Sequence, residues 1–269
     1  MNKILLAFFL CITICLPVFG QAEAVEAHTV VILENKLQAV FGGVESGKFV
    51  NANIAVKSLP GLKTFTPYGS DGLSGARFEV GSGERPSIPC EEFYQYASND
   101  NPKNGVSFSS NVPWDPSPRQ VTKLKTNSKI YRSIVRKFLK KQGLRNPVVN
   151  ITALFKVDLE GDGVDEVVIL GERYVRFGPG TQKGDYSFLL VRKVINGKVK
   201  EILATGEFYK QAVRFGAPNR LEISSIVDLD GDGTLEIVIY GAYYEGVWAE
   251  AYKIKGGTSS KVLTTGCGV

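Results

Sequence analysis

Two short acidic segments constrain the fold of this chain more than any other feature of its sequence. They span 158–166 (DLEGDGVDE) and 228–236 (DLDGDGTLE), and the second begins 70 residues after the first. In each segment acidic residues occupy positions one, three, five and nine, and a glycine at position six permits a sharp turn. Together with the backbone carbonyl of position seven, these carboxylates are oxygen donors of the kind that Ca²⁺ prefers. We therefore expect two calcium loops.

The candidate calcium ligands are four carboxylates and one backbone carbonyl in each loop. They are Asp158, Glu160, Asp162, the Val164 carbonyl and Glu166, and then Asp228, Asp230, Asp232, the Thr234 carbonyl and Glu236. Position twelve is Ile169 or Ile239, within a β-branched run, which excludes an EF-hand because that loop needs a carboxylate there and a helix after it. The alternative is a pair of tight turns whose acids face water. Repulsion among so many carboxylates disfavours it.

The residues around the two loops form a repeat of strands. Each unit begins with an apolar strand, passes through the acidic loop and leaves on a second strand. A further pair of strands follows, joined by Asn196-Gly197 in the first unit, a type I′ hairpin signal, and by Gly256-Gly257-Thr258 in the second. Four antiparallel strands per unit is the composition of a propeller blade. We expect two propeller-blade-like units over 151–269.

These strand-loop-strand units resemble the FG-GAP or VCBS-type repeats of integrin-like propellers, which carry the pattern Asp-x-Asp-x-Asp-Gly-x-x-Asp. The resemblance covers 151–269 and implies two bound Ca²⁺ ions on the ligands named above. Glu replaces Asp at position three of the first loop and at position nine of both, so we expect the loops to differ in geometry and affinity. Two blades cannot close a propeller, so either the N-terminal half supplies strands or the blades stack differently. The layout also resembles a group of exported bacterial proteins without an assigned activity.

The first 20 residues have the pattern of a secretory signal peptide. A short positive start precedes an apolar run from Ile4 to Val18 and a small-residue cleavage site at Gly20. The run is too short to span a membrane, and no later stretch is long and apolar enough. We expect an exported protein, periplasmic or secreted, with no membrane span in its mature form. Lipidation at Cys15 is a weaker alternative, because bulky residues precede it.

Removal of this signal peptide leaves two cysteines, Cys90 and Cys267. An even count in an exported protein favours a disulfide. The alternative is a pair of free, buried thiols. A disulfide would connect the last residues to the middle of the chain.

The whole chain is expected to be mainly β, or α+β overall. Short strands, turns and a short helix are expected in an N-terminal domain at 21–97. The stretch 98–118 is rich in Asn, Ser and Pro, which predicts a linker. A basic amphipathic helix region follows at 119–150, with Asn127 or Ser128 as N-cap and Gly143 as the stop signal.

The helix in 119–150 combines an apolar stripe, starting at Ile130, with a basic face. Ten basic residues and no acidic ones lie between Arg119 and Arg145. The candidate anion-binding residues are Lys129, Arg132, Arg136, Lys137, Lys140 and Lys141. Such a face can bind an anionic lipid or polysaccharide. We favour a solvated helix face, because aromatic residues for base stacking are sparse there, and for the same reason we do not expect nucleic acid as a partner.

No catalytic constellation is visible in the sequence. The chain has one histidine, His28, which disfavours a His-based triad or a multi-His metal site. We therefore expect an exported, calcium-binding, non-catalytic binding or structural module of the bacterial envelope or the extracellular space. Two alternatives stay open, an anionic-surface binder acting through 119–145 and a calcium-dependent hydrolase. The sequence does not identify the partner; the candidates are an anionic envelope polymer and another protein.

Overall fold

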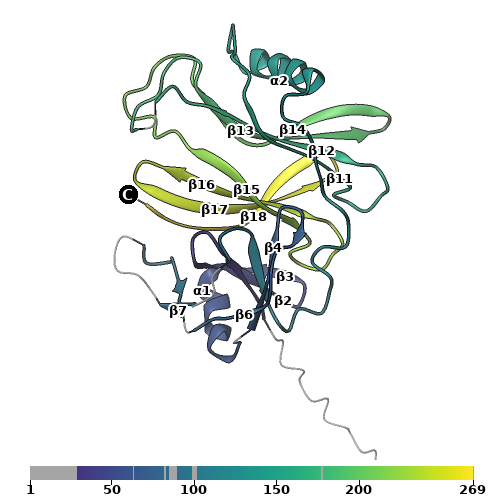
Figure 1. The fold of residues 1–269 in the computed structure, drawn as a ribbon, viewed down its shortest axis with the longest axis vertical. Helices are drawn as coiled ribbons and strands as arrows, with labels where there is room; N and C mark the ends of the chain where they lie inside the picture. The colour runs from purple at the N-terminus through teal and green to yellow at the C-terminus, as the bar shows by residue number, and fades with distance from the viewer. Residues whose placement is uncertain are drawn as a thin grey trace, which may run out of the picture.

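The structure is a computed structural model that describes residues 29–62, 64–81, 83–84, 90–98, 102–176 and 178–268. The expected signal peptide, 1–20, lies outside these residues. The described residues form a mainly β fold, as predicted, with three antiparallel sheets, none of them closed (Figure 1). Among the described residues no helix is long and apolar enough to cross a membrane.

The N-terminal sheet has nine strands, ordered β5-β4-β9-β1-β2-β8-β7, with β3 paired to β2 and β6 to β4. Their bounds are β1 (Val30–Glu34), β2 (Ala39–Glu45), β3 (Lys48–Val50), β4 (Thr64–Gly69), β5 (Gly72–Leu73), β6 (Phe78–Glu79), β7 (Gly83–Glu84), β8 (Gln95–Tyr96) and β9 (Val106–Ser109). A short helix, α1 (Ala52–Ala55), continues into the 3-10 helix η1 (Val56–Gly61). Both pack on one face of the sheet, where Ala55 and Leu59 join an apolar cluster with Phe65.

Strand β9 lies inside the range 98–118, which the sequence predicted to be a linker. It pairs with β1 on one side and β4 on the other, so the linker prediction is wrong for this part of the range. Its two serines, Ser107 and Ser109, are buried, and each hydroxyl has a hydrogen-bond partner. Ser107 Oγ donates to Asn35 Oδ1 at 2.8 Å, and Ser109 Oγ accepts from the Val31 backbone N–H at 2.9 Å. Polar composition here reflects buried hydrogen bonds and not an extended connection.

Two further sheets carry the acidic loops. The first repeat sheet has the order β10-β11-β12-β13-β14, and the second repeat sheet β15-β16-β17-β18. Their bounds are β10 (Thr122–Lys123), β11 (Ile151–Val157), β12 (Glu166–Arg173), β13 (Tyr186–Ile195), β14 (Lys198–Phe208), β15 (Arg220–Val227), β16 (Glu236–Tyr243), β17 (Gly246–Lys255) and β18 (Thr258–Gly268). Four strands therefore form the second repeat sheet, whereas the short β10 adds a fifth to the first. Asn196 and Gly197 both have positive φ, as a type I′ turn requires.

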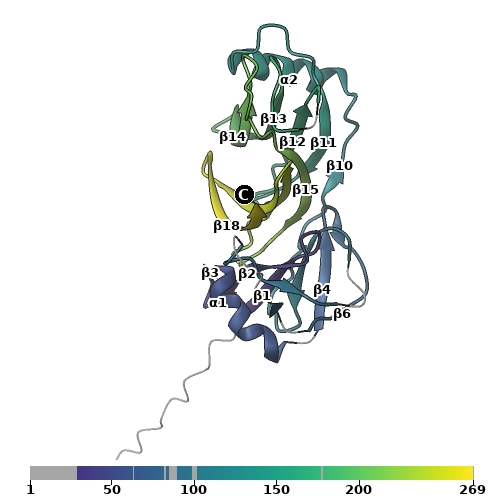
Figure 2. The same ribbon diagram turned by 90° about the vertical axis from the view of Figure 1, so that its left-hand side faces the viewer.

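The three sheets stack face to face with the second repeat sheet in the middle (Figures 1 and 2). One apolar cluster, which includes Phe41 and Val238, joins it to the N-terminal sheet. Another, which includes Leu189 and Ile237, joins it to the first repeat sheet. Helix α2 (Lys129–Lys141) covers the outer face of the first repeat sheet. The two short helical segments and α2 thus lie at opposite ends of the stack.

Helix α2 begins and ends where the sequence predicted. Ser128 occupies the N-cap position, although its side chain makes no capping bond, and Gly143 follows the helix with a φ of +94°. Ile130 does not belong to the apolar stripe, because the residue is 70% exposed. It lies five and nine residues before the buried Val135 and Leu139, which places it about 140° and 180° around the helix from them.

The predicted disulfide between Cys90 and Cys267 is present, and its two cysteines are 177 positions apart in the sequence. Cys267 lies in β18 of the middle sheet, and Cys90 packs among buried residues of the N-terminal sheet. The bond therefore fastens two neighbouring layers of the stack. It is compatible with an exported protein.

Candidate cation site

The aspartate at position one organises the backbone of each loop. Asp158 accepts hydrogen bonds from the backbone N–H groups of Gly161 at 2.7 Å and Gly163 at 2.9 Å. Asp228 accepts the two corresponding bonds at the same distances. The glycines at positions four and six have positive φ in both loops, a conformation that other residues adopt only at a cost in energy. The repeated motif therefore produces the same local backbone twice.

The glutamate at position nine closes each loop from inside the protein. Glu166 and Glu236 are fully buried, and one carboxylate oxygen of each accepts the backbone N–H of the residue at position two at 2.8 Å. Burial raises the pKa of Glu166 to about 7 and that of Glu236 to about 8, although the backbone hydrogen bond opposes the shift. A buried carboxylate of this kind needs a cation or a proton to be stable.

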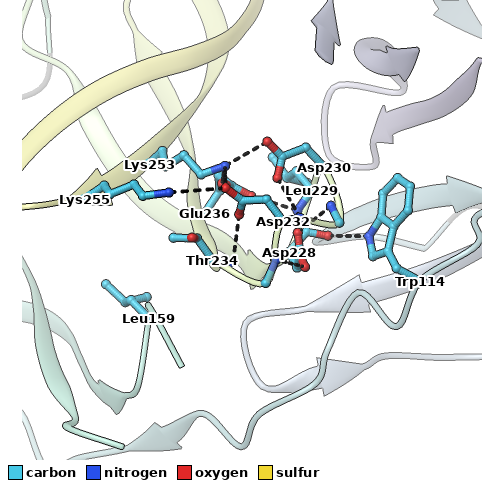
Figure 3. Close-up of polar contacts among 12 residues, drawn as sticks. Trp114, Leu159, Asp228, Leu229, Asp230, Asp232, Thr234, Glu236, Lys253 and Lys255 are labelled. Atoms are coloured by element: carbon cyan, nitrogen blue, oxygen red, sulfur yellow. Dashed lines mark hydrogen bonds and ion pairs between the residues drawn. The ribbon is translucent and has the colours of Figure 1, made fainter. Parts of the chain in front are cut away.

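A lysine from the third strand of each repeat supplies a positive charge. Lys193 of β13 lies 2.8 Å from Glu166 Oε1 and also pairs with Glu160. Lys253 of β17 places its Nζ atom 2.8, 3.1 and 2.9 Å from carboxylate oxygens of Asp230, Asp232 and Glu236 (Figure 3). Each ammonium thus lies among carboxylates that the sequence assigned to Ca²⁺.

Neither lysine was predicted from the sequence, although a signal for both exists. In the first repeat Val167 pairs with Arg192, so the preceding Glu166 lies opposite Lys193. In the second Ile237 pairs with Tyr252, so Glu236 lies opposite Lys253. Each lysine also precedes its hairpin turn by three residues, since Asn196 follows Lys193 and Gly256 follows Lys253 at that distance. When the two repeats are aligned on their hairpin turns as well as on their loops, the lysine falls at the same position in both.

The two lysines have different electrostatic surroundings. Burial opposes the charged form of Lys253, but its contacts with Asp230, Glu236 and Asp232 raise its pKa. For Lys193 burial prevails over attraction by Asp158 and lowers the pKa. The ammonium in the second loop is therefore the more firmly charged of the two.

Three carboxylates converge in the second loop. One oxygen each from Asp228, Asp230 and Glu236 lies within 4.8 Å of the others, and no other group of three acidic, His or Cys side chains in the described part of the chain meets this criterion. Oxygens on opposite sides of a Ca²⁺ ion, each about 2.3–2.6 Å from it, are about 5 Å apart. The spacing therefore fits one Ca²⁺ ion. Thr234, whose carbonyl is the fifth predicted ligand, is buried.

The predicted ligands of the first loop are more open. Residues 161–165 are exposed, including Val164, the residue predicted to offer a carbonyl. Asp165, at position eight, forms an ion pair of 2.8 Å with Lys156 outside the loop. A Ca²⁺ site in the first loop stays a prediction.

The two loops are joined to each other by backbone contacts and by one arginine. The backbone N–H of Leu235 donates to the Leu159 carbonyl at 2.7 Å. Arg119 donates to the carbonyls of Asp158 at 2.7 Å and Gly233 at 2.6 Å, and also to Leu159 at 3.2 Å. This residue belongs to the basic segment that the sequence offered as an anion-binding face, but its guanidinium is occupied between the loops.

The second loop has an additional cover from residues just before Arg119. Trp114 Nε1 donates to the Asp228 carbonyl at 2.9 Å (Figure 3). The Asp228 backbone N–H donates to the Pro116 carbonyl at 2.9 Å. Neither contact was predicted, because Trp114 and Pro116 lie in the range expected to be a linker. They hold the loop from the side of the N-terminal sheet.

The predicted anion-binding residues share helix α2 at the end of the stack. Lys129, Arg136, Lys137 and Lys140 are exposed, and Arg132 is half-buried. Lys141 is exposed and forms an ion pair of 2.9 Å with Glu201. The structure therefore keeps most of this basic face open to solvent.

Comparisons with protein-family models, curated proteins and solved structures gave no match.

Proposed function

We propose that the protein is an exported, non-catalytic binding or structural module that binds Ca²⁺ in its acidic loops. The observation that carries this proposal is the convergence of Asp228, Asp230 and Glu236 in the second loop. Three acidic side chains in that loop contact one ammonium, and a fourth, Asp228, converges with two of them, which leaves excess negative charge for a divalent cation to neutralise. Asp228, Asp230, Asp232, Glu236 and the Thr234 carbonyl would hold the ion.

The ion would act on stability. The second loop connects β15 to β16 in the middle layer, whose two faces pack against the two outer sheets. A ligand that binds only the folded state adds about 2.7 kcal/mol of stability at a concentration 100 times its Kd. We interpret the two repeat sheets as blade-like units in an open stack of FG-GAP type, with Ca²⁺ fastening the first two strands of each unit.

The proposed location is the periplasm or the extracellular space. The disulfide between Cys90 and Cys267 and the predicted signal peptide both favour an oxidising compartment. Extracellular modules bind Ca²⁺ with dissociation constants of about 10⁻⁴–10⁻³ M. A loop that already contains an ammonium is compatible with affinity in this weak range.

Thermal denaturation of the Asp230→Asn and Asp165→Asn variants tests the calcium site. We expect Ca²⁺ to raise the Tm of the wild-type protein and EDTA to lower it. Asp230→Asn should lose most of the Ca²⁺-dependent rise, because a converging ligand is lost. Asp165→Asn also removes a loop carboxylate, but at position eight, and should keep the rise. A wild-type melting curve that is the same in Ca²⁺ and in EDTA would contradict the proposal.

A second candidate function is binding to an anionic surface through α2. The observation that favours it is the exposure of Lys129, Arg136, Lys137 and Lys140 on the outermost layer of the stack. Such binding weakens steeply with salt. Co-sedimentation with anionic vesicles should be reduced in the double variant Arg136→Glu/Lys140→Glu.

The matched control for this second function carries the same charge change at the other end of the stack. Lys48→Glu/Lys57→Glu alters two exposed lysines near α1 and should leave vesicle binding unchanged. Binding that is absent, or insensitive to salt, would dispose of the second function.

A further inference from the structure

The centre of the second loop contains a cationic group that belongs to the chain itself. The Lys253 side chain is only 12% exposed, and its Nζ atom lies within 3.1 Å of oxygens of Asp230, Asp232 and Glu236. Two of these residues belong to the converging group that fits Ca²⁺. A Ca²⁺ ion would lie about 2.3–2.6 Å from the same oxygens. Two cations cannot share those oxygens at such short range, because they repel each other.

The ammonium is the charged partner of the innermost carboxylate of the loop. Glu236 is fully buried, and its Oε1 atom lies 2.9 Å from Lys253 Nζ. A buried carboxylate needs a cation or a proton beside it. A Ca²⁺ ion can therefore take the place of the ammonium at this oxygen.

The same arrangement occurs twice in the chain. Lys193 occupies the equivalent strand position and contacts Glu160 and Glu166, the residues at positions three and nine of the first loop. Lys253 contacts positions three, five and nine of the second. An inward lysine is therefore part of the repeat, as the acidic loop is.

We infer that Lys253 is a built-in competitor of Ca²⁺, which fills the second loop when the ion is absent and leaves its carboxylates when the ion binds. This inference rests on the proposed function and describes the regulation of the same site. The exchange releases one ammonium for each Ca²⁺ bound and breaks no covalent bond. The Phe49 ring, whose centroid lies 5.6 Å from Nζ, offers the displaced ammonium a cation–π contact.

Two consequences follow from this competition. The apparent affinity for Ca²⁺ is lower than the carboxylates alone would give, because only the fraction of molecules with a vacated loop can bind. The loop also remains partly neutralised without Ca²⁺, so the folded state tolerates chelation. Removing the ammonium should therefore increase calcium affinity and make the fold more dependent on calcium.

Calcium titration calorimetry on the wild-type protein, Lys253→Met and Lys255→Met tests the first consequence. Lys253→Met should lower the Kd for Ca²⁺ about tenfold or more, because no ammonium must leave first. Lys255→Met is the control, since this exposed lysine lies 3.8 Å from Asp232 and outside the centre of the loop. Its effect on the Kd should be much smaller.

The possible outcomes separate this inference from the proposed function. If the wild-type protein binds Ca²⁺ and Lys253→Met binds it equally or more weakly, the competitor role is wrong and the calcium site stands. If only Lys253→Met binds, the lysine excludes Ca²⁺ from the wild-type protein and does not exchange with it, which contradicts both the exchange and the proposed function. If neither binds, both fail.

A second measurement uses only the wild-type protein and does not depend on how a variant folds. Labelling of lysine amines with acetic anhydride, followed by mass spectrometry, reports the exposure of each ammonium. Saturating Ca²⁺ should increase labelling of Lys253 several-fold relative to Lys255, which is 69% exposed already. Labelling of Lys253 that does not change with Ca²⁺ would overturn the inference.

Discussion

The two acidic loops share a motif and a backbone conformation but gather different numbers of carboxylates around their lysines. Lys193 contacts two carboxylates in the first loop, and Lys253 contacts three in the second. Residues 161–165 are exposed in the first loop, whereas Thr234 and Leu235 are buried at the equivalent end of the second. The group of three converging carboxylates described above belongs to the second loop.

The difference follows from the layer in which each loop lies. The second loop leaves the middle sheet and is held by Trp114 and Pro116 next to the N-terminal sheet. The first loop belongs to an outer sheet, and its position-eight acid pairs away from the loop with Lys156. The motif determines the turn, and the neighbouring layers determine how closely the carboxylates approach one another. Three predictions test this comparison, and a fourth tests the support that the N-terminal sheet gives to the strand before the second loop.

The largest effect on stability is expected when the two inward lysines are replaced and no metal is present. Lys253→Met leaves three carboxylates without their cation and Lys193→Met leaves two, so the second-loop variant should lose more stability, about 3–5 kcal/mol as for a broken buried ion pair. Urea denaturation in EDTA measures both losses, with the exposed Lys198→Met as control. Equal losses would mean that the two loops are electrostatically equivalent.

A somewhat smaller effect is expected at the contact that both loops share. Arg119→Ala removes every hydrogen bond from the guanidinium to the carbonyls of Asp158, Leu159 and Gly233. Because these bonds come from a charged donor, the free energy of unfolding should fall by about 2–3 kcal/mol. Urea denaturation measures the loss, and Arg119→Lys, which keeps the charge, should recover part of it. No loss in Arg119→Ala would show that the loops are stabilised independently.

An effect on the second loop alone is expected from Trp114→Phe. The variant keeps an aromatic ring but loses the hydrogen bond to the Asp228 carbonyl. The free energy of unfolding should fall by about 1 kcal/mol. Calcium binding to the second loop should also weaken. Thermal denaturation and calcium titration measure the two effects. Trp248→Phe is the matched control, because it also loses one indole bond, to Asn219, but away from the loops. Calcium affinity that falls equally in both variants would contradict a local role for Trp114.

The smallest effect concerns pH and the support that the N-terminal sheet gives to β15. Glu34 is fully buried and accepts a hydrogen bond of 2.7 Å from Ser224 of β15. Burial raises its pKa above the ordinary 4.5, against the hydrogen bonds from Ser224 and Leu37 and the charge of Lys36, which lower it. The folded state therefore holds this proton more tightly than the unfolded state, and its stabilising contribution is lost as pH rises from 4.5 to the raised pKa.

Glu34→Gln keeps hydrogen-bonding capacity and cannot ionise. The free energy of unfolding of the wild-type protein should therefore decrease, relative to this variant, as pH rises above 4.5, and the difference should level off above the raised pKa. Urea denaturation between about pH 4.5 and pH 8 measures the difference. A difference that stays constant over this range would mean that Glu34 has its ordinary pKa in the folded protein.

Features that depend on neighbours in the chain were predictable. The spacing of acids and glycines determined both loop backbones, Asn196-Gly197 determined its hairpin, and β-branched runs around Ile169 and Ile239 determined strands in place of helices. The disulfide between Cys90 and Cys267 followed from counting the cysteines left after export. Each of these depends on backbone conformation or covalent chemistry that a few adjacent residues, or a simple count, specify.

The surroundings of the loops were not predictable in this way. The composition of 98–118 predicted a linker, but buried hydroxyl partners place β9 in the middle of a sheet. Lys193 and Lys253 reach the loops through strand pairing, and Arg119 and Trp114 reach them through the stacking of layers. The sequence by itself therefore determined two acidic loops with the donors of a calcium site. Only the tertiary structure decided that a lysine ammonium lies inside each and that the second is the more enclosed, because both depend on residues brought together from distant parts of the chain.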